Sequence, residues 1–228
     1  MRRAEIEREH LDGPLARHDR DAALADIDRL SAWFGGAALS IRAVCGFLAA
    51  APRPRVPVVV DVGGGRGDLA RRLVRAVRAR GGRVRVVLLD RDEQGLARSH
   101  ATYPEIVRVC ADAAALPFRD GGVDVAMASL VIHHLRPDAA AACLESMRSA
   151  ARLGVVVNDL LRTRLSWLMV VLATRLFARH PIARHDGPLS VRRAYTPAEL
   201  RVLCEKAGWR RFTITRHVLL ARVLVRAW

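Results

Sequence analysis

Residues 56–72, VPVVVDVGGGRGDLARR, decide the fold that can be predicted for this chain. Residues 56–62 are apolar and β-branched, which is typical of a buried strand. The GGGRG segment that follows is a turn in which the backbone can adopt positive φ and pass close to a ligand. Residues 68–80 then repeat apolar side chains at helical spacing. A strand, a glycine-rich turn and a helix in this order predict a nucleotide-type binding site.

The spacing of the glycines narrows the kind of ligand. Asp61 precedes Gly63, Gly65 and Gly67, a D-x-G-x-G-x-G pattern that is tighter than the dinucleotide fingerprint G-x-G-x-x-G. This turn leaves less room for a pyrophosphate, and it has no Lys-Ser/Thr ending of the P-loop type. An acid at the strand end suits a cationic ligand better than a phosphate. A tight structural turn without a ligand is the alternative.

Two further acids follow predicted strands. Residues 83–89 are a second β-branched run that leads into Asp90, about 20 residues beyond the glycine turn. A carboxylate there is placed to accept hydrogen bonds from ribose hydroxyls, or to cap the next helix. Residues 105–110 predict a third strand, which Asp112 and Ala113 follow within the segment ADAAALPF.

The fourth predicted strand, over residues 122–131, runs into a pair of histidines. Ligands of open α/β sheets bind at the carboxyl ends of the strands, so Ser129, Leu130, His133 and His134 are expected to line the site. Imidazole titrates near neutral pH and can act as a base. Capping of the next helix is the alternative, and the two neighbouring rings are expected to face different ways.

The fifth predicted strand, over residues 154–158, ends at Asn158 and Asp159, which are candidate substrate contacts or helix caps. The run LSWLMVVLAT within residues 160–178 is too short to cross a bilayer. It predicts a buried helix, the wall of a substrate pocket, or a lid that rests on a membrane if the substrate is greasy.

Residues 179–193 are predicted to form a loop, because Gly187 and Pro188 interrupt the helical pattern. A long loop inside a compact domain is often functional. His185 and Arg193 are its candidate catalytic and substrate-contacting side chains.

The two ends of the chain carry helical and strand patterns of their own. Residues 1–55 predict a helical N-terminal extension that either covers the active site or packs on the edge of the sheet. Trp33 lies in this extension, as a core residue or a substrate contact. Thr196 and Glu199 predict a capping box at the start of a helix. Residues 209–228 predict two adjacent strands that finish the sheet in antiparallel fashion.

In chain order, the acid-led glycine turn, Asp90, ADAAALPF, SLVIHHL and YTPAEL resemble class I S-adenosylmethionine (SAM)-dependent methyltransferases. The resemblance implies an α/β fold with a Rossmann-like seven-stranded sheet, mostly parallel with an antiparallel C-terminal strand, and a helical N-terminal cap. Residues 56–228 would form the methyltransferase domain, with a helical lid insertion over about residues 160–195.

The resemblance also implies SAM as the cofactor. Asp61 would lie near the SAM ammonium group, Asp90 would bind the ribose, and Asp112 with Ala113 would read the adenine. The expected cofactor-binding residues are Asp61, Gly63, Gly64, Gly65, Gly67, Asp90, Arg91, Asp112, Ala113, Ser129, Leu130 and His134.

The acceptor is less well defined by the sequence. The H-D-G-x-x-S-x-x-R segment at residues 185–193 resembles bacterial members associated with polyketide or phenolic metabolites, which favours O-methylation of a small phenol-like molecule. The candidate catalytic residues are His133, His134 and His185, and the candidate substrate contacts are Trp33, Asn158, Asp159 and Arg193. Without an Asp-Asp-Asn set of the catechol type, we expect a metal-independent reaction. Methylation of RNA or protein, C-methylation of a quinol-like substrate, and SAM binding without transfer are the alternatives.

Composition sets further limits. The net charge of +15 comes almost entirely from arginine, and only 5% of residues are aromatic. Because the arginines are scattered, a nucleic-acid partner is disfavoured, although the surface should attract anionic substrates. The four cysteines are far apart, which predicts reduced thiols in a cytoplasmic protein. No signal peptide or transmembrane segment is predicted; peripheral membrane contact and a homodimer remain compatible with the sequence.

Overall fold

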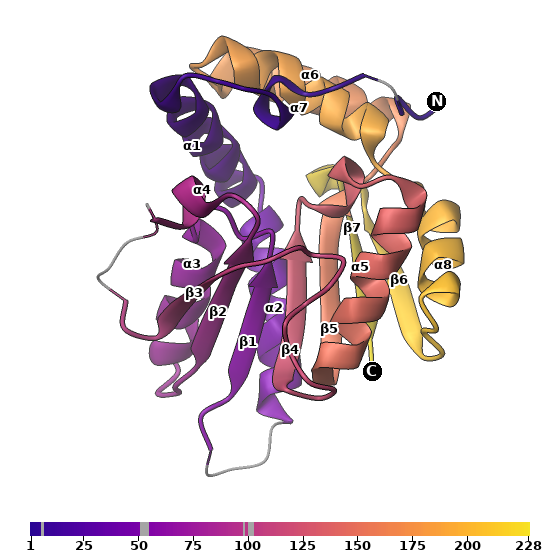
Figure 1. The fold of residues 1–228 in the computed structure, drawn as a ribbon. Coiled ribbons are helices and arrows are strands. Elements are labelled where there is room, and N and C mark those ends of the chain that lie inside the picture. Colours follow the sequence, from indigo (N-terminus) through magenta and orange to yellow (C-terminus); the bar gives the residue numbers. More distant parts are fainter. Residues whose placement is uncertain (6, 51–54, 98, 100–102) are drawn as a thin grey trace.

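The computed structural model describes residues 1–5, 7–50, 55–97, 99 and 103–228. Its centre is a seven-stranded sheet with helices on both faces (Figure 1). On one face pack α2 (Gly36–Ala49) and α3 (Asp68–Arg78), and on the other α5 (Pro137–Ala150) and α8 (Pro197–Lys206). This three-layer arrangement buries both faces of the sheet, as parallel strands require.

The strand order is β3-β2-β1-β4-β5-β7-β6. Strands β1 to β5 pair in parallel, whereas β7 is antiparallel to both of its neighbours, β5 and β6. The predicted fold class and the antiparallel finish are therefore confirmed. The bounds are β1 Val58–Val62, β2 Arg85–Asp90, β3 Ile106–Cys110, β4 Val123–Ser129, β5 Ala151–Leu160, β6 Phe212–His217 and β7 Arg222–Ala227.

The glycine turn joins β1 to α3 through left-handed backbone conformations. Gly63, Gly65 and Gly67 have φ of 66°, 52° and 79°. Side chains other than glycine rarely adopt these values, which explains the alternate glycines of the sequence pattern. The predicted strand–turn–helix unit is confirmed.

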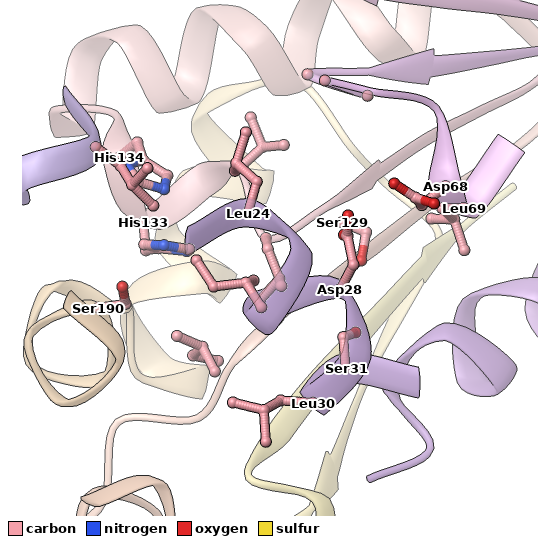
Figure 2. Close-up of a pocket in the computed structure, with 18 of the residues that line it drawn as sticks. Leu24, Asp28, Leu30, Ser31, Asp68, Leu69, Ser129, His133, His134 and Ser190 are labelled. Carbon is pink, nitrogen blue, oxygen red and sulfur yellow. The ribbon is translucent and has the colours of Figure 1, made fainter. Parts of the chain in front are cut away.

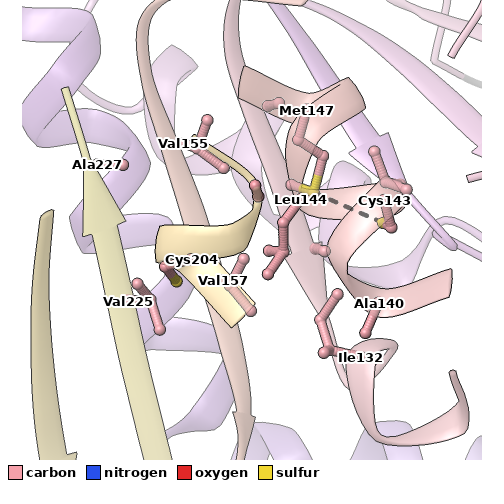
Figure 3. Close-up of a cluster of buried hydrophobic side chains, with 14 of the residues drawn as sticks. Ile132, Ala140, Cys143, Leu144, Met147, Val155, Val157, Cys204, Val225 and Ala227 are labelled. Carbon is pink, nitrogen blue, oxygen red and sulfur yellow. Dashed lines mark hydrogen bonds between the residues drawn. The ribbon is translucent and has the colours of Figure 1, made fainter. Parts of the chain in front are cut away.

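Two hydrophobic clusters fill the space between the sheet and its helices. Figure 3 shows one of them, where Leu144 and Met147 of α5 lie beside Val157 of β5 and Cys204 of α8. On the opposite face, α2 crosses β5 so closely that a Cβ on Gly154 would lie 2.3 Å from the ring of Phe47. A glycine in β5 thus permits the helix to approach the sheet.

The segment predicted as a loop at residues 179–193 is instead a helix, α7 (Pro181–Arg193), with Pro188 inside it. It packs against α6 (Arg164–Phe177), and a Cβ on Gly187 would lie 2.7 Å from Thr174 of α6. The two residues read as helix breakers are therefore accommodated by tertiary packing, which overrides local propensity.

A cap covers the carboxyl ends of the parallel strands. It consists of α6, α7, the N-terminal segment with η1 (His10–Asp12), and α1 (Arg17–Trp33), which packs against both α6 and α7 (Figure 1). By contrast, α2 lies on the face of the sheet and contacts β4 and β5. Of the predicted extension, residues 6 and 51–54 lie outside the described part of the chain.

Within the described residues, no single helix is long and apolar enough to cross a membrane. The pair α1 and α2 passes the same test of length and composition when taken together, with a bend of 66° between the two helices.

Candidate active site

A cavity of about 490 Å³ lies between the carboxyl ends of the strands and the cap. In Figure 2, His133 and His134 stand at one end of it and Asp68 and Leu69 at the other, with side chains of α1 between them. All predicted cofactor-binding residues except Gly67 line this cavity. The cavity has two halves. The glycine turn and the neighbouring acids line one, the polar half, and the helices of the cap line the other, the cap half or acceptor half.

The glycine turn supplies an open cradle on the polar side. A Cβ added to Gly65 would meet no atom within 4 Å, so the backbone faces free space there. Asp61, which is 1% exposed at the end of β1, has one carboxylate oxygen, Oδ2, without a hydrogen-bond partner. A buried acceptor left without a partner is costly, and a ligand with N–H donors would satisfy it.

Burial dominates the titration of the acids in this half. Burial, reinforced by the nearby charge of Asp90, raises the pKa of Asp61 to about 7. Burial also raises the pKa of Asp28, on α1, to about 6, although three arginines oppose the shift. Both carboxylates would gain from a cationic group between the cradle and α1. Asp28 was not among the predicted site residues, because nothing in its local sequence separates it from an ordinary helix surface.

Asp90 ends β2 and holds the cradle in shape. Its Oδ2 accepts the N–H of Gly65 at 2.8 Å, and its Oδ1 accepts the N–H of Asp92 at 2.9 Å. Each carboxylate oxygen has further lone-pair capacity for ligand hydroxyls. The N-capping alternative for Asp90 is wrong, because Asp92 accepts the N–H of Gln94 at 3.1 Å.

The next loop and strand end complete the polar half. Asp112 accepts the N–H of Ala114 at 2.8 Å, which fixes a tight turn beside Ala113. At the end of β4, Leu130 adopts φ of 61°, a strained conformation for a branched side chain, and its N–H donates to Asn158 O at 2.9 Å. Backbone strain of this kind is held in place by its surroundings and gathers at functional sites.

The histidines end the other half, in η2 (Ile132–His134). His133 is buried, its backbone N–H donates to Asp159 Oδ2 at 3.0 Å, and its Nδ1 lies 2.6 Å from Asp159 Oδ1. Because a carboxylate only accepts, Nδ1 carries a proton, which leaves Nε2 as the ring atom that can accept a hydrogen bond. Burial opposes ionisation of Asp159, yet the contacts with His133 lower its pKa.

His134 repeats this arrangement with residues of the N-terminal segment. Its Nδ1 lies 2.9 Å from Asp12 Oδ1, and its ring centroid lies 4.1 Å from that of His133. The expectation that the rings face different ways is wrong, because both turn Nε2 toward Glu9, at 3.9 Å for His133 and 3.8 Å for His134. A short helix, rather than an extended strand, carries the pair.

Glu9 is a site residue that the sequence did not reveal. It is 3% exposed, its Oε1 has no hydrogen-bond partner, and burial raises its pKa. Glu9, His133 and His134 each bring one ligand-type atom within 4.8 Å of the others, so they could hold a cation. However, Nε of Arg193 lies 3.8 Å from Glu9 Oε1, and this positive charge competes with a metal ion for the carboxylate.

The N-terminal segment is fixed over the cavity by α7. Asp186 accepts the backbone N–H groups of His10 and Leu11, both at 3.0 Å. Arg193 bonds Asp12 at 2.6 Å and the carbonyl of His134 at 3.2 Å. Arg193 therefore joins the segment to the histidine pair and does not line the cavity.

Four other predicted residues also lie outside the cavity lining. Trp33 is 63% exposed, so it is neither core nor substrate contact in this structure. His185 is exposed and bonds Asp186, and the amide of Asn158 donates to Gly36 O and Ser40 Oγ of α2, both at 2.8 Å. Asp159 lies behind His133 rather than at the surface of the cavity. In this structure, therefore, the predicted substrate contacts Trp33, Asn158 and Asp159 and the predicted catalytic residue His185 do not line the cavity.

Residues 59–154 match a family model described as "Methyltransferase domain". This match covers nearly all of β1 to β4 and the start of β5, with the glycine turn, Asp90 and the histidine pair. With the seven-stranded sheet and its antiparallel β7, the fold and the site define a methyltransferase of the Rossmann-like type. The domain match and the shared fold together support a class I SAM-dependent methyltransferase, with SAM as the cofactor. No curated protein sequence matches it.

Solved structures share this fold at low sequence identity. A SAM-dependent methyltransferase from Aquifex aeolicus has a TM-score of 0.53 and 18% identity over 75% of this chain and 81% of that chain. Human N-acetylserotonin methyltransferase, in complex with SAM, has a TM-score of 0.64 and 15% identity over 97% of this chain and 59% of its own length. The plantazolicin methyltransferase BpumL, in complex with a monoazolic desmethylPZN analog and SAH, has a TM-score of 0.66 and 10% identity over 91% and 89%.

Proposed function

We propose that this methyltransferase transfers the methyl group of SAM to an oxygen of a small phenol-like or polyketide-type molecule, without a metal ion. The observation that carries this proposal is the position of His133. Its Nε2 makes no hydrogen bond within the described residues and lies 3.9 Å from Glu9 Oε1, its Nδ1 is held by buried Asp159, and its ring lines the same cavity as the glycine turn. An oriented imidazole of this kind removes a proton from a hydroxyl.

The polar half of the cavity fits SAM. Asp61, with its orphaned buried oxygen, would bind the ammonium group, and the open backbone at Gly65 would admit the methionine portion. Asp90 would accept the ribose hydroxyls, and Asp112 with Ala113 would read the adenine. Gly63, Gly64, Arg91, Ser129, Leu130 and His134 would complete the walls. When bound, SAM supplies an electrophilic methyl group.

The chain's own contribution is position and proton transfer. An acceptor hydroxyl in the cap half would donate to Nε2 of His133, and the developing imidazolium would be stabilised by the Asp159 carboxylate. Phenols have pKa near 10, so a base at this place assists their attack at neutral pH. His134, held by Asp12, would orient the acceptor from the side.

The cap favours a small acceptor over a polymer. Leu24 and Ile27 of α1, Met169 and Val170 of α6 and Ala183 of α7 line the acceptor half, so its walls are largely apolar. A nucleobase or side chain in a long polymer would have to pass these helices to reach His133. C-methylation of a quinol-like ring is the second candidate, because the same walls fit that ring equally well.

The test is to incubate the protein with labelled SAM and a panel of phenols, quinols and polyketide aromatics, and to locate the new methyl group by mass spectrometry. We expect a methyl ether on at least one panel member. Methylation on carbon would support the second candidate, and label on RNA or protein alone would overturn the proposal. The same incubation with His133→Ala is expected to lose activity, whereas His185→Ala is expected to retain it.

A further inference from the structure

The outer side of α6 is an unpartnered apolar surface. Leu165, Leu168, Leu172 and Leu176 recur at helical spacing, and all four are exposed, Leu168 and Leu172 at 57% each. A continuous leucine row in water is costly for a soluble surface and marks a docking site. We call this row, together with exposed Trp33 and Leu219, the outer apolar face.

The outer apolar face is continuous across three elements. Trp33, at the end of α1, packs its ring at 6.0 Å from the ring of Phe177 on α6, with the planes nearly perpendicular. Leu219 lies in η3 (Val218–Leu220), which contacts α6, and it is 81% exposed. The face therefore belongs to the folded cap and not to one isolated helix.

The outer apolar face leads into the cavity. The opposite side of α6 lines the acceptor half with Met169, Val170 and Ala173, so one helix separates the cavity from the surface. Leu219 belongs to both, since it lines the cavity and is exposed on the outside. An apolar molecule could thus enter the acceptor half without crossing a polar rim at this point.

The positive charge around the outer apolar face indicates which kind of partner binds there. Arg164, Arg175 and Arg179 are exposed on or beside α6, and α6 contains no acidic residue. Arg29 lies over the Trp33 ring at 5.6 Å from its centroid, but it is paired with Asp26, so among the described residues the uncompensated charge comes from the arginines of α6 and its end. A second copy of this chain would bring equal positive charges together, whereas an anionic lipid surface complements both the leucines and the arginines.

We propose that the outer apolar face rests on an anionic phospholipid bilayer and admits a lipid-soluble acceptor to the cavity through Leu219. A helix of 14 residues is only about 21 Å long, so α6 would lie in the interface and not span it. This inference deepens the proposed function, on which it rests for the identity of the acceptor as a hydroxy compound, by adding that the acceptor is lipophilic.

The test is co-sedimentation with phosphatidylcholine vesicles, with and without phosphatidylglycerol. We expect binding that requires phosphatidylglycerol and falls about tenfold between low and high salt. The double variant Leu168→Glu/Leu172→Glu is expected to bind at least about tenfold less. The matched control is Val202→Glu on α8, an equally exposed apolar position at 62%, which is expected to bind like the wild type.

Several results would overturn the inference. These are failure of the wild type to bind anionic vesicles, equal loss of binding in Val202→Glu, or a wild-type dimer that the double variant converts to a monomer without any vesicle binding. Leu176→Glu, at 64% exposure, gives a second variant if the double variant fails to fold. It is expected to weaken vesicle binding in the same direction.

Two further measurements test the proposed methyl transfer independently of vesicle binding. Binding of adenosylhomocysteine by calorimetry and methylation of a water-soluble phenol are expected to be unchanged in the double variant, since Leu168 and Leu172 do not line the cavity. Vesicle binding without methylation of any phenol or quinol would support the docking surface and overturn the proposed function. Methylation of soluble acceptors without vesicle binding would support the proposed function and overturn the docking surface.

Discussion

His133 and Asp159 form a buried pair in which one carboxylate holds both the ring and the backbone of one histidine. Nδ1 lies 2.6 Å from Oδ1, and the His133 N–H donates to Oδ2 at 3.0 Å. The two residues come from the ends of neighbouring strands, β4 and β5, which the sheet brings together. This contact fixes both the tautomer and the direction of the imidazole.

Asp159→Asn should lower kcat about a hundredfold with a smaller change in KM, because the amide can stabilise neither the required tautomer nor the imidazolium. The measurement is steady-state methylation of the acceptor found in the panel. His133→Ala should cost about as much, and the double variant little more than either, because the two residues act as a unit. Fully additive losses would contradict this assignment.

Asp61 should make SAM binding dependent on pH. With its pKa raised to about 7, the carboxyl is protonated and uncharged at lower pH. Affinity for SAM should therefore fall by up to about tenfold per pH unit below pH 7. Calorimetry over about pH 6–8 checks this, and Asp61→Asn should bind weakly with a flat profile. If Asp61→Asn showed the same dependence of SAM affinity on pH as the wild type, the assignment of this dependence to Asp61 would be refuted.

The same shift has an opposite effect on the stability of the ligand-free protein. In the folded protein the pKa of Asp61 is raised from 3.8 to about 7. The protonated carboxyl therefore contributes stability that is fully present below the unfolded pKa of 3.8. This contribution is lost as the pH rises through the folded pKa of about 7. Asp61→Asn should therefore increase the free energy of unfolding at about pH 8 by about 2 kcal/mol. Denaturant titration without SAM gives the value, and a destabilised variant would count against the buried charge.

Asp90→Ala should weaken SAM binding by about tenfold to a hundredfold, because hydrogen bonds to a carboxylate are worth about 1.5–3 kcal/mol. The loss of the Gly65 contact should also loosen the cradle. Asp120→Ala, which removes an exposed carboxylate bonded to Ser149, is the control and should bind normally. Unchanged affinity in Asp90→Ala would remove the ribose assignment.

Gly154→Ala should destabilise the protein by about 1–3 kcal/mol, because its Cβ would lie 2.3 Å from the Phe47 ring and would push α2 off the sheet. Gly46→Ala is the matched control within α2, where a Cβ would meet no atom within 4 Å. It should stabilise the protein by about 0.5–1 kcal/mol. Thermal unfolding of both variants tests the packing, and similar shifts in the two would contradict it.

Chelation should leave methyl transfer within about twofold of its starting rate. Arg193 already lies 3.8 Å from Glu9 and supplies the positive charge in this cluster. The measurement compares activity before and after dialysis against a chelator. Loss of activity that a first-row divalent ion restores would show instead that Glu9, His133 and His134 hold a metal.

The parts of this fold that depend on neighbours in sequence were predictable. The glycine turn follows from alternate glycines after a β-branched run, and the capping box of Thr196 and Glu199 is present as predicted, with both hydrogen bonds formed. Strand ends share one edge of a parallel sheet, so the convergence of Asp61, Asp90 and Ser129 on one cavity also follows from the order of elements.

The parts that depend on distant contacts were not predictable. α7 contains Gly187 and Pro188, which signal a loop by local rules, but packing on α6 keeps the segment helical. Glu9 reaches the histidine pair because residues of α7, such as Asp186 more than 170 residues away, hold the N-terminal segment. One charged residue among many near a chain end carries no signal of that kind.

The packing of Glu9 against the histidine pair has a consequence for the synthesis of this chain. The N–H of Ala4 donates to the carbonyl of Arg192, and the Arg3 side chain donates to the carbonyl of Arg193, which lies 190 residues away. Glu9 precedes α7 in the chain, so during synthesis it cannot dock until α7 has been made and folded. A nascent chain that has made β1 to β4 but not α7 would therefore present the glycine turn to a cavity that still lacks its Glu9 wall.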